Sequence, residues 1–231
     1  MDNTRTPVLY IVGNYNIDLV MGTLPHWPAQ GTEMMLEHSA LRPGGSAGNC
    51  ALAAAAMQLP HCAVGCQGDD AFTPWLAAQF PGDSARWPQY PCETSLTVAV
   101  THPNKERSFL SNHGHITRLT AGDVLDQLPA AAGEGDIVLL CGTFLCTRLL
   151  SDYPQLLATL RQRGFTLAVD TGWPPQGWSD PLRHEVDRWL GDCDWLLLND
   201  VETQQLAARP TLAEAAAALA ARLSGSGGCV V

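Results

Sequence analysis

The chain has 231 residues, of which 46% are hydrophobic and 16% are charged, so it can bury a substantial core and disorder is not expected. The formal net charge is −10, from 13 basic and 23 acidic residues, and Lys105 is the one lysine. This balance disfavours nucleic acid and anionic membranes as partners, because both attract basic surfaces. We expect no leader and no membrane-spanning segment, and therefore a cytoplasmic protein with small-molecule ligands.

Eight cysteines raise the question of disulfide bonds or zinc. No Cys-x-x-Cys pair occurs, and several cysteines lie within or beside apolar runs, so free buried thiols in a reducing cytoplasm explain them best. His61, Cys62 and Cys66 form a mildly metal-like cluster, but they straddle an expected strand, which disfavours a metal site. The cysteines are residues 50, 62, 66, 92, 141, 146, 193 and 229.

Strand-like and helix-like segments alternate along most of the chain. The apolar run Val8–Val12 ends at Gly13 and is typical of a strand buried on both faces. The Ala-rich segment Ser46–Met57 predicts a helix. Further strands are predicted at Ala63–Cys66, Asp136–Cys141, Thr166–Asp170, Trp195–Leu198 and Cys229–Val231, and further helices at Phe72–Phe80, Leu149–Arg163, Leu182–Leu190, Val201–Ala208 and Leu212–Leu223. This alternation predicts an α/β fold with a doubly wound, mostly parallel sheet.

Two stretches interrupt this rhythm. Glu33–Leu41 and Ser95–Ser111 show strand-like alternation with no helix between the strands, and Pro103–Glu106 supplies a turn within the second stretch. They predict a small antiparallel sheet that projects from the main layer. Ser224–Gly228 is rich in Gly and Ser, but a turn between a helix and a strand is favoured there over a phosphate-binding loop.

The first polar motif follows the first predicted strand. Asn14, Asn16 and Asp18 share one face if the chain stays extended, because side chains alternate with a period of two. The carboxyl ends of strands border the ligand crevice in doubly wound sheets, and these groups suit several sugar hydroxyls. An Asx-rich turn that closes the strand is the alternative, and the motif alone favours it.

The second motif is Pro43–Asn49, directly before the Ala-rich helix. Its paired glycines, Gly44 and Gly45, let a ligand approach the backbone, and the helix N-terminus offers free N–H donors beside Asn49. A glycine loop with Ser46 as N-cap is the alternative. The motif is neither a Walker A loop nor a dinucleotide fingerprint, because it lacks Gly-Lys-Ser/Thr and G-x-G-x-x-G.

The third motif follows the predicted strand Trp195–Leu198. Asn199 and Glu202 lie one helical turn apart and can orient water around Mg²⁺. The alternative, a capping box, is favoured by the motif alone. Asp170 also ends a predicted strand and is a further candidate for the crevice. His113 and His115 are interpreted as ordinary surface residues.

Taken in order, these motifs resemble the PfkB/ribokinase family of carbohydrate kinases. The resemblance implies a Rossmann-like α/β fold with a β-sheet lid, here one domain over residues 1–231 with a lid from about 15–42 and 93–112. The matching residues are Gly13–Asp18, Gly44–Ala51, Gly65–Phe72, Glu106–Phe109 and Asn199–Glu202.

The family transfers the γ-phosphoryl of ATP to a hydroxymethyl group of a sugar or nucleoside. The resemblance implies that Asn199 and Glu202 position Mg²⁺ and phosphate, and that the lid excludes water and is a candidate homodimer interface. Few basic residues lie in the lid, which favours an unphosphorylated substrate, and Arg107 suits the carboxylate of an acidic sugar. The expected substrate-binding residues are Asn16, Asp18, Gly44, Gly45, Ser46, Asn49 and Arg107.

The chain also departs from the family pattern. Gln58 stands where the family has Gly or Ser, and the Asp-Thr-x-Gly-Ala-Gly-Asp motif, which supplies an anion hole and the catalytic base, does not occur up to Val231. We therefore expect the base beyond Val231, and a fragment that is impaired in turnover and marginally stable. A non-catalytic sugar-binding or regulatory protein is the open alternative. A nicotinamide-dependent oxidoreductase is disfavoured by the missing G-x-G-x-x-G.

Overall fold

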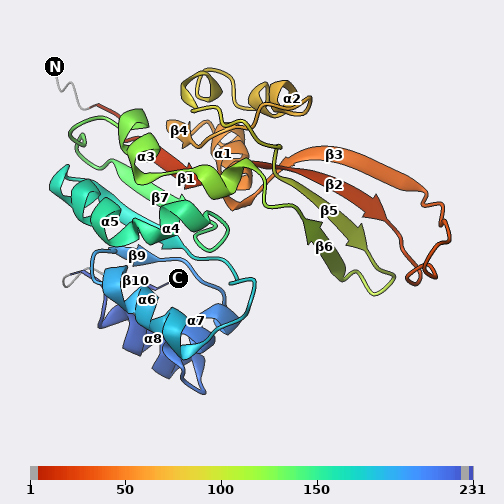
Figure 1. Cartoon of the computed structure of the whole chain (residues 1–231). Coiled ribbons are helices and arrows are strands. Elements are labelled where there is room, and N and C mark those ends of the chain that lie inside the picture. Colours follow the sequence, from red (N-terminus) through yellow and green to blue (C-terminus); the bar gives the residue numbers. More distant parts are fainter. Residues whose placement is uncertain (1–4, 225–228, 231) are drawn as a thin grey trace.

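This computed structural model describes residues 5–224 and 229–230. Their strands form two sheets (Figure 1). The larger sheet has six strands in the order β10-β9-β8-β7-β1-β4, and every neighbouring pair is parallel. Val12 lies level with Val64 and Leu140, so the central carboxyl ends are aligned. Its strands are β1 (Leu9–Gly13), β4 (His61–Val64), β7 (Ile137–Cys141), β8 (Thr166–Asp170), β9 (Trp195–Leu196) and β10 (Cys229–Val230).

Helices cover this sheet because its strands are apolar on both faces. Ile11 and Leu139 contribute to the hydrophobic cluster that contains helix α1, whereas Val12 and Leu140 contribute to a second cluster on the opposite face. The predicted doubly wound α/β layer is thereby confirmed. The helices are α1 (Ser46–Ala56), α2 (Thr73–Ala77), α3 (Ala121–Gln127), α4 (Thr147–Ser151), α5 (Tyr153–Gln162), α6 (Asp180–Leu190), α7 (Asp200–Ala207) and α8 (Leu212–Ala220), with 3₁₀ turns η1 (Ser84–Arg86) and η2 (His115–Arg118).

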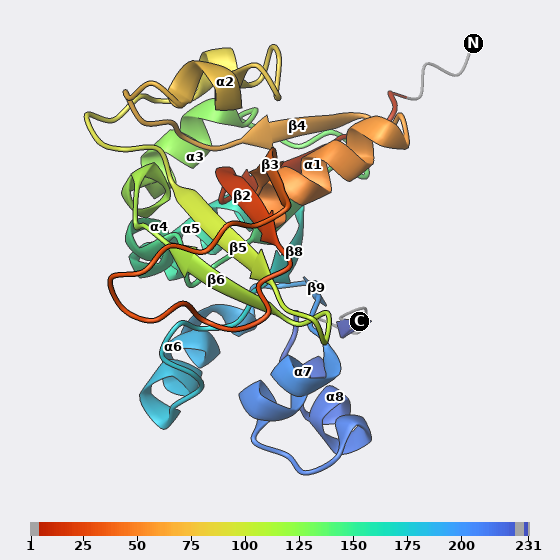
Figure 2. The same ribbon diagram turned by 90° about the vertical axis from the view of Figure 1, so that its right-hand side faces the viewer.

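The second sheet projects from the layer, as Figures 1 and 2 show. Its order is β3-β2-β5-β6; the β2–β3 and β5–β6 pairs are antiparallel, and a parallel β2–β5 pair joins them. This confirms the separate small sheet expected from the sequence. Its strands are β2 (Asn16–Gly22), β3 (His38–Gly44), β5 (Leu96–Thr101) and β6 (Arg107–Ser111).

Several predicted boundaries are wrong in instructive ways. The predicted helix Leu149–Arg163 is divided into α4 and α5, because Pro154 lacks an N–H and fits only the first turn of a helix. The strand predicted at Glu33–Leu41 starts at His38 and continues to Gly44, where it leads into α1. The turn predicted at Ser224–Gly228 lies, after its first residue, outside the described residues, as does Val231.

His115 is buried at the base of the smaller sheet, which corrects the interpretation of it as a surface residue; His113 is exposed. Its Nδ1 accepts a hydrogen bond from the Ser95 N–H at 3.0 Å, so its Nε2 donates to the Tyr15 carbonyl at 3.0 Å. Burial lowers the pKa of His115 to about 4, against the opposing effect of that carbonyl. The neutral ring thus ties the starts of β2 and β5 to η2.

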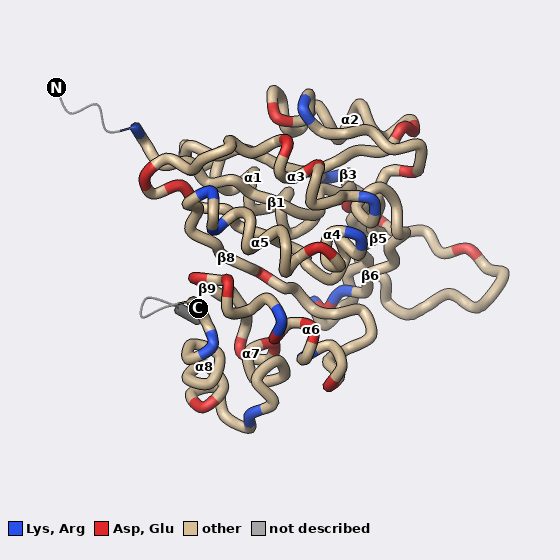
Figure 3. Tube along the Cα trace, turned by 60° about the vertical axis from the view of Figure 1, so that its left-hand side comes forward, with Lys and Arg blue, Asp and Glu red and all other residues tan. Residues whose placement is uncertain are grey.

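Charged positions are dispersed along the chain trace rather than gathered in one stripe (Figure 3). Several arginines form local ion pairs, such as Arg86 with Asp83 and Arg183 with Asp180, both at 2.8 Å. None of the helices in the described part of the chain is long and apolar enough to span a membrane.

Candidate functional site

The strand order of the larger sheet reverses at β1. From β1 the chain passes to β4 on one side and later to β7 on the other. In open α/β sheets such a switch point, at the carboxyl ends of the strands, is where ligands bind. Asn14 follows β1, Asp170 ends β8 and Asn199 follows β9, so polar groups from distant segments meet at this edge.

The motif after β1 forms a hydrogen-bonded row. The Asn14 Nδ2 lies 3.5 Å from the Asn16 Oδ1, and the Asn16 Nδ2 donates to the Asp18 Oδ1 at 2.8 Å. Asn16 begins β2, so the chain is extended here. An extended chain is what the interpretation with three polar side chains on one face required, in contrast to the Asx-rich turn. Burial raises the pKa of Asp18, while the Asn16 hydrogen bond and the charge of Arg107 act in the opposite direction.

The paired glycines bring this row against the start of α1. Gly45 has a φ of +84°, and a Cβ there would lie 2.2 Å from the Asn14 carbonyl oxygen and 2.4 Å from the Asn16 Oδ1. A Cβ on Gly44 would lie within the Asp18 carboxyl group. Side chains at these positions would displace the polar row. Gly45 is also the N-cap of α1, so the alternative with Ser46 as N-cap is wrong.

Asn14, which the sequence indicated only as a member of the first motif, also contacts α1. It is buried, its carbonyl accepts from the Gly48 N–H at 3.3 Å, and its Oδ1 lies 3.5 Å from the Ala47 nitrogen. Asn14 therefore joins the polar row to the first turn of α1. Asn49 lies in that turn, with its N–H bonded to the Gly45 carbonyl at 2.8 Å and its side chain exposed.

Arg107 reaches the same face of the smaller sheet as Asp18. Thr97 lies opposite both Asp18 and Ser111. Arg107 is four residues from Ser111 along β6, an even number, so all four side chains share one face. The Arg107 guanidinium lies 5.6 Å from the centre of the Phe109 ring. The structure thus places a cation on the sheet face that carries the Asp18 carboxylate.

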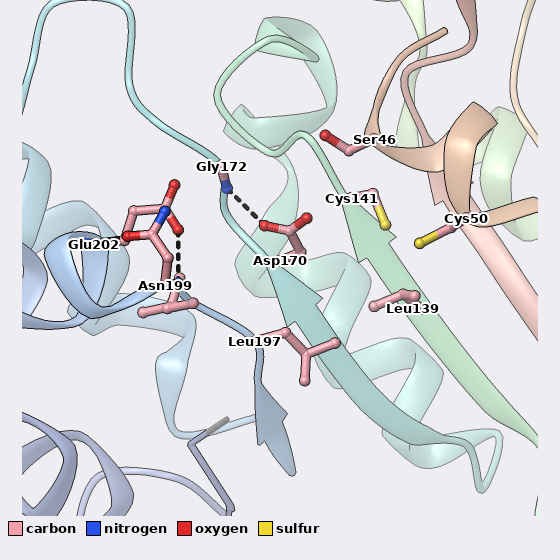
Figure 4. A pocket seen from close by; sticks show the side chains of 10 residues that line it. Ser46, Cys50, Leu139, Cys141, Asp170, Gly172, Leu197, Asn199 and Glu202 are labelled. Carbon is pink, nitrogen blue, oxygen red and sulfur yellow. Dashed lines mark hydrogen bonds between the residues drawn. The ribbon is translucent and has the colours of Figure 1, made fainter. Parts of the chain in front are cut away.

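A cavity of about 440 Å³ lies beside the polar row. Ser46, the first residue of α1, borders it and directly follows Gly45, which lies against the row. Asn16, Asp18 and Asn49 do not line it. The lining residues are Ser46, Cys50, Leu139, Cys141, Asp170, Gly172, Leu197, Leu198, Asn199 and Glu202 (Figure 4).

Two carboxylates face this cavity. Burial raises the pKa values of Asp170 and Glu202, and the negative charge of Asp170 adds to the shift at Glu202. The Gly172 N–H donates to the Asp170 Oδ1 at 3.0 Å and partly offsets the effect of burial there. The loop after β8 therefore fixes one carboxylate, while α7 supplies the other.

Asn199 and Glu202 form the capping box that the sequence offered as the alternative. The Asn199 Oδ1 accepts from the Glu202 N–H at 2.8 Å, and the Glu202 Oε2 accepts from the Asn199 N–H at 3.1 Å. Both residues nevertheless line the cavity. The capping box thus orients Glu202 through its Oε2, and the Oε1 of Glu202 takes no part in it.

The donor set of the cavity suits Mg²⁺. Asp170, Asn199 and Glu202 offer oxygen atoms, and Mg²⁺ is commonly held by one or two carboxylates together with water and substrate phosphates. Within residues 5–224 and 229–230 no three His, Cys, Asp or Glu side chains gather as a metal cluster. At the disfavoured cysteine cluster, the Cys62 sulfur accepts from Arg86 at 2.8 Å.

Cys50 and Cys141 also line the cavity, whereas the sequence predicted only that they are buried thiols. Their positions in the sequence were the one sign that they could lie at the site. Cys50 lies one helical turn after Ser46, and Cys141 ends a strand next to the first one.

Comparisons with known proteins bear on the fold and the family of the chain. No curated protein matches the chain in sequence. Ribokinase from Arabidopsis thaliana complexed with ribose and ATP has 19% identity and a TM-score of 0.71, and the match covers 95% of this chain and 70% of that one. Fructokinase from Xylella fastidiosa with bound ATP has 17% identity, a TM-score of 0.71 and the same coverage. These structures are similar in fold. The sequence profile of the pfkB family carbohydrate kinases matches residues 8–226, and the chain therefore belongs to this family.

Proposed function

We propose that the chain is an ATP-dependent kinase that transfers the γ-phosphoryl group to a hydroxyl of an unphosphorylated sugar or nucleoside. One observation carries this proposal: the Asn16–Asp18 row is held against Gly44 and Gly45, next to the cavity that contains the Asp170 and Glu202 carboxylates. A polyol on the row would thus lie close to the groups that suit a metal and phosphate. The ATP-bound structures of the similar fructokinase and ribokinase support the choice of phosphoryl donor.

In this proposal the polar row binds the sugar. The Asp18 carboxylate accepts hydroxyl hydrogens, and Asn16, held by its bond to Asp18, orients the carboxylate. A hydrogen bond to a charged group contributes about 1.5–3 kcal/mol. Asn49 adds an exposed amide one helical turn beyond Gly45, and the glycines let the sugar ring approach the backbone.

Asn199 and Glu202 would hold Mg²⁺ through water, with Asp170 as a further oxygen donor. When bound, the ion neutralises charge on the transferring phosphate. The chain's own contribution is orientation, because the capping box fixes Glu202 and the Gly172 N–H fixes Asp170.

The smaller sheet would act as a lid over the sugar. Its face toward the substrate carries Asp18 and Arg107, and Arg107 would meet an anionic substituent if the sugar has one. The opposite face carries an apolar row across all four strands, formed by Leu41, Leu19, Val98 and Leu110. Leu41 and Leu110 are 38% and 54% exposed. We propose that a second copy of the chain packs on this row.

The sugar site can be tested by binding. The chain is titrated calorimetrically with D-ribose, D-fructose and adenosine, and the ligand that binds is repeated on Asp18→Asn. We expect this substitution to weaken binding about 10-fold or more, because it removes a charged acceptor. Asp126→Asn, an exposed carboxylate on α3, is the matched control. Binding that is unaffected by Asp18→Asn, or no binding of any of the three ligands, would contradict the proposal.

Phosphoryl transfer is tested separately, with Mg²⁺, ATP and the ligand that binds, by following ADP formation. Glu202→Gln is expected to reduce turnover more than it reduces sugar binding, since Glu202 lines the carboxylate cavity and not the polar row. Sugar binding without any ATP turnover would favour the non-catalytic sugar-binding alternative for this chain.

A further inference from the structure

Two thiols meet at the cavity described above. Cys50 projects from α1 and Cys141 from the carboxyl end of β7, and Figure 4 shows their sulfur atoms pointing toward each other. Both cysteines line the same cavity, which places the two thiols side by side at its wall. The two residues are far apart in sequence, so the fold alone brings them together.

The surroundings of the pair allow an oxidant to reach one sulfur. Both cysteines line the cavity, but Cys50 is only partly buried, whereas Cys141 is 1% exposed. The other buried thiols have different contacts. The Cys66 thiol donates to the His115 carbonyl at 3.3 Å, and the Cys193 thiol lies 3.8 Å from the Trp189 carbonyl.

We propose that Cys50 and Cys141 form a reversible disulfide when the protein meets a peroxide. The proposal extends beyond the kinase assignment, since it depends on the two sulfurs and the cavity and not on any substrate. The plain alternative is that both cysteines act only as small apolar side chains, which is common for free cysteines.

The chemistry is balanced with peroxide as the oxidant. The Cys50 thiol first releases its proton, and the thiolate attacks one peroxide oxygen. The O–O bond breaks, Cys50 becomes a sulfenic acid, and the hydroxide that leaves takes up the released proton to give one water. The Cys141 sulfur then attacks the Cys50 sulfur, the S–O bond breaks and a second water leaves. The two thiols lose two electrons and two hydrogens in total, and the peroxide gains them.

Local electrostatics favour Cys50 as the attacking sulfur. The neighbouring Cys141 thiol lowers the pKa of Cys50, although burial and the nearby Asp170 carboxylate act in the opposite direction. The same contact, with burial, raises the pKa of Cys141. A thiolate reacts where a thiol does not, so the accessible sulfur reacts first and the buried one resolves the sulfenic acid.

The disulfide would change the candidate site. It would join α1 to β7 covalently beside the carboxylate cavity, which both cysteines line. Ser46 lies one turn before Cys50 in the same helix and Asn49 directly precedes it, so fixing Cys50 restrains both of them. Oxidised protein is therefore expected to bind sugar with an altered affinity that returns after reduction.

Peptide mapping of the native chain tests the proposal. Protein treated with hydrogen peroxide is alkylated, digested without reduction and analysed by mass spectrometry, beside a sample oxidised in denaturant. We expect a cross-linked pair of peptides that contain Cys50 and Cys141, lighter by two hydrogens than their sum, enriched in the native sample and lost after thiol reduction.

Three variants test whether Cys50 and Cys141 are the cysteines that form the cross-link. Cys50→Ser and Cys141→Ser should each abolish the cross-link, whereas Cys92→Ser, a partly buried thiol elsewhere, should leave it unchanged. The proposal is overturned if native wild-type protein gives no such cross-link, if Cys50 stops at the sulfinic acid while Cys141 is still alkylated, or if denatured protein forms the cross-link as readily. Because the readout is covalent, it can fail while the kinase proposal stands, and the reverse is equally true.

Discussion

The two sheets of this protein differ in how their faces are used. In the six-stranded sheet, Val12 and Leu140 on one face and Ile11 and Leu139 on the other are all buried under helices. In the four-stranded sheet, one face carries Asp18 and Arg107 and the other carries an apolar row that ends at the exposed Leu110. The first sheet is stabilised by its own core, whereas the second leaves surfaces that suit ligands or another copy of the chain.

We infer that the larger sheet mainly stabilises the fold, whereas the smaller sheet mainly serves binding and association. Substitutions in the larger sheet should act mainly on the free energy of unfolding. Substitutions in the smaller sheet should act mainly on binding and association, and those at the junction of the two sheets should act on both. The following substitutions test this division from the largest expected effect to the smallest.

Leu140→Ala should be the most destabilising of these changes. Leu140 is fully buried between β1 and β8, and removal of a buried leucine side chain costs about 2–5 kcal/mol of folding free energy. Met35→Ala, at an 82% exposed side chain in the loop before β3, is the control and should stay within about 0.5 kcal/mol. Urea denaturation followed by circular dichroism measures both. If both variants unfold at the same urea concentration, the core of the larger sheet does not have the stabilising role that we assign to it.

His115 should make stability at the junction depend on pH. Its pKa is lowered from 6.5 to about 4 in the folded chain, so its contribution is complete above pH 6.5 and is lost as the pH falls toward 4. The loss amounts to at most about 3 kcal/mol. Other groups titrate in this range, so the informative quantity is the difference in the unfolding free energy between wild type and His115→Gln at each pH. His113→Gln, at an exposed position, should reproduce the wild-type profile.

Gly45→Ala should weaken both folding and sugar binding. Its Cβ would contact Asn14 and Asn16 in addition to the strain of a φ of +84°. Gly31→Ala is a matched control, because Gly31 has a φ of +80° and nothing within 4 Å of the added Cβ. The strain alone costs about 1–2 kcal/mol, and the contacts at Gly45 should add about 1–3 kcal/mol. If the two variants unfold at the same urea concentration, the close approach of the row to Gly45 is not important for stability.

Leu110→Lys should have the smallest effect on monomer stability, within about 0.5 kcal/mol, because Leu110 is 54% exposed. It should nevertheless abolish self-association through the apolar row. Phe109→Lys, at a 60% exposed neighbour on the opposite face of β6, should leave association intact. Sedimentation velocity measures both. A dimer that survives Leu110→Lys would show that the apolar row is not the interface.

Much of the larger sheet could be predicted from local sequence. The run Val8–Val12 and the segment Thr166–Asp170 are apolar and short, which is typical of parallel strands, and both are close to the observed β1 and β8. The break between α4 and α5 was missed because the apolar spacing continues across it, and the backbone restriction at Pro154 outweighs that spacing. Register and strand order depend on packing and had no local signal.

The candidate site was predicted unevenly. Asn16, Asp18 and Gly45 were expected to meet, and the structure brings them together. His115 was misjudged, because one histidine among polar neighbours carries no sign of burial. Asn14 was noticed only as part of a motif, since its link to α1 depends on where the helix lies.

The sequence by itself determined the order of strands and helices, the placement of polar residues directly after the strands, and the pair of glycines before α1. These features arise from side-chain periodicity and from backbone restrictions that act within a few residues. Only the tertiary structure decided that Asp170 and Glu202 share a cavity and that Cys50 faces Cys141. Such pairs are distant in the chain, and they meet because buried apolar faces must pack, which fixes the order of the strands and the position of each helix on the sheet.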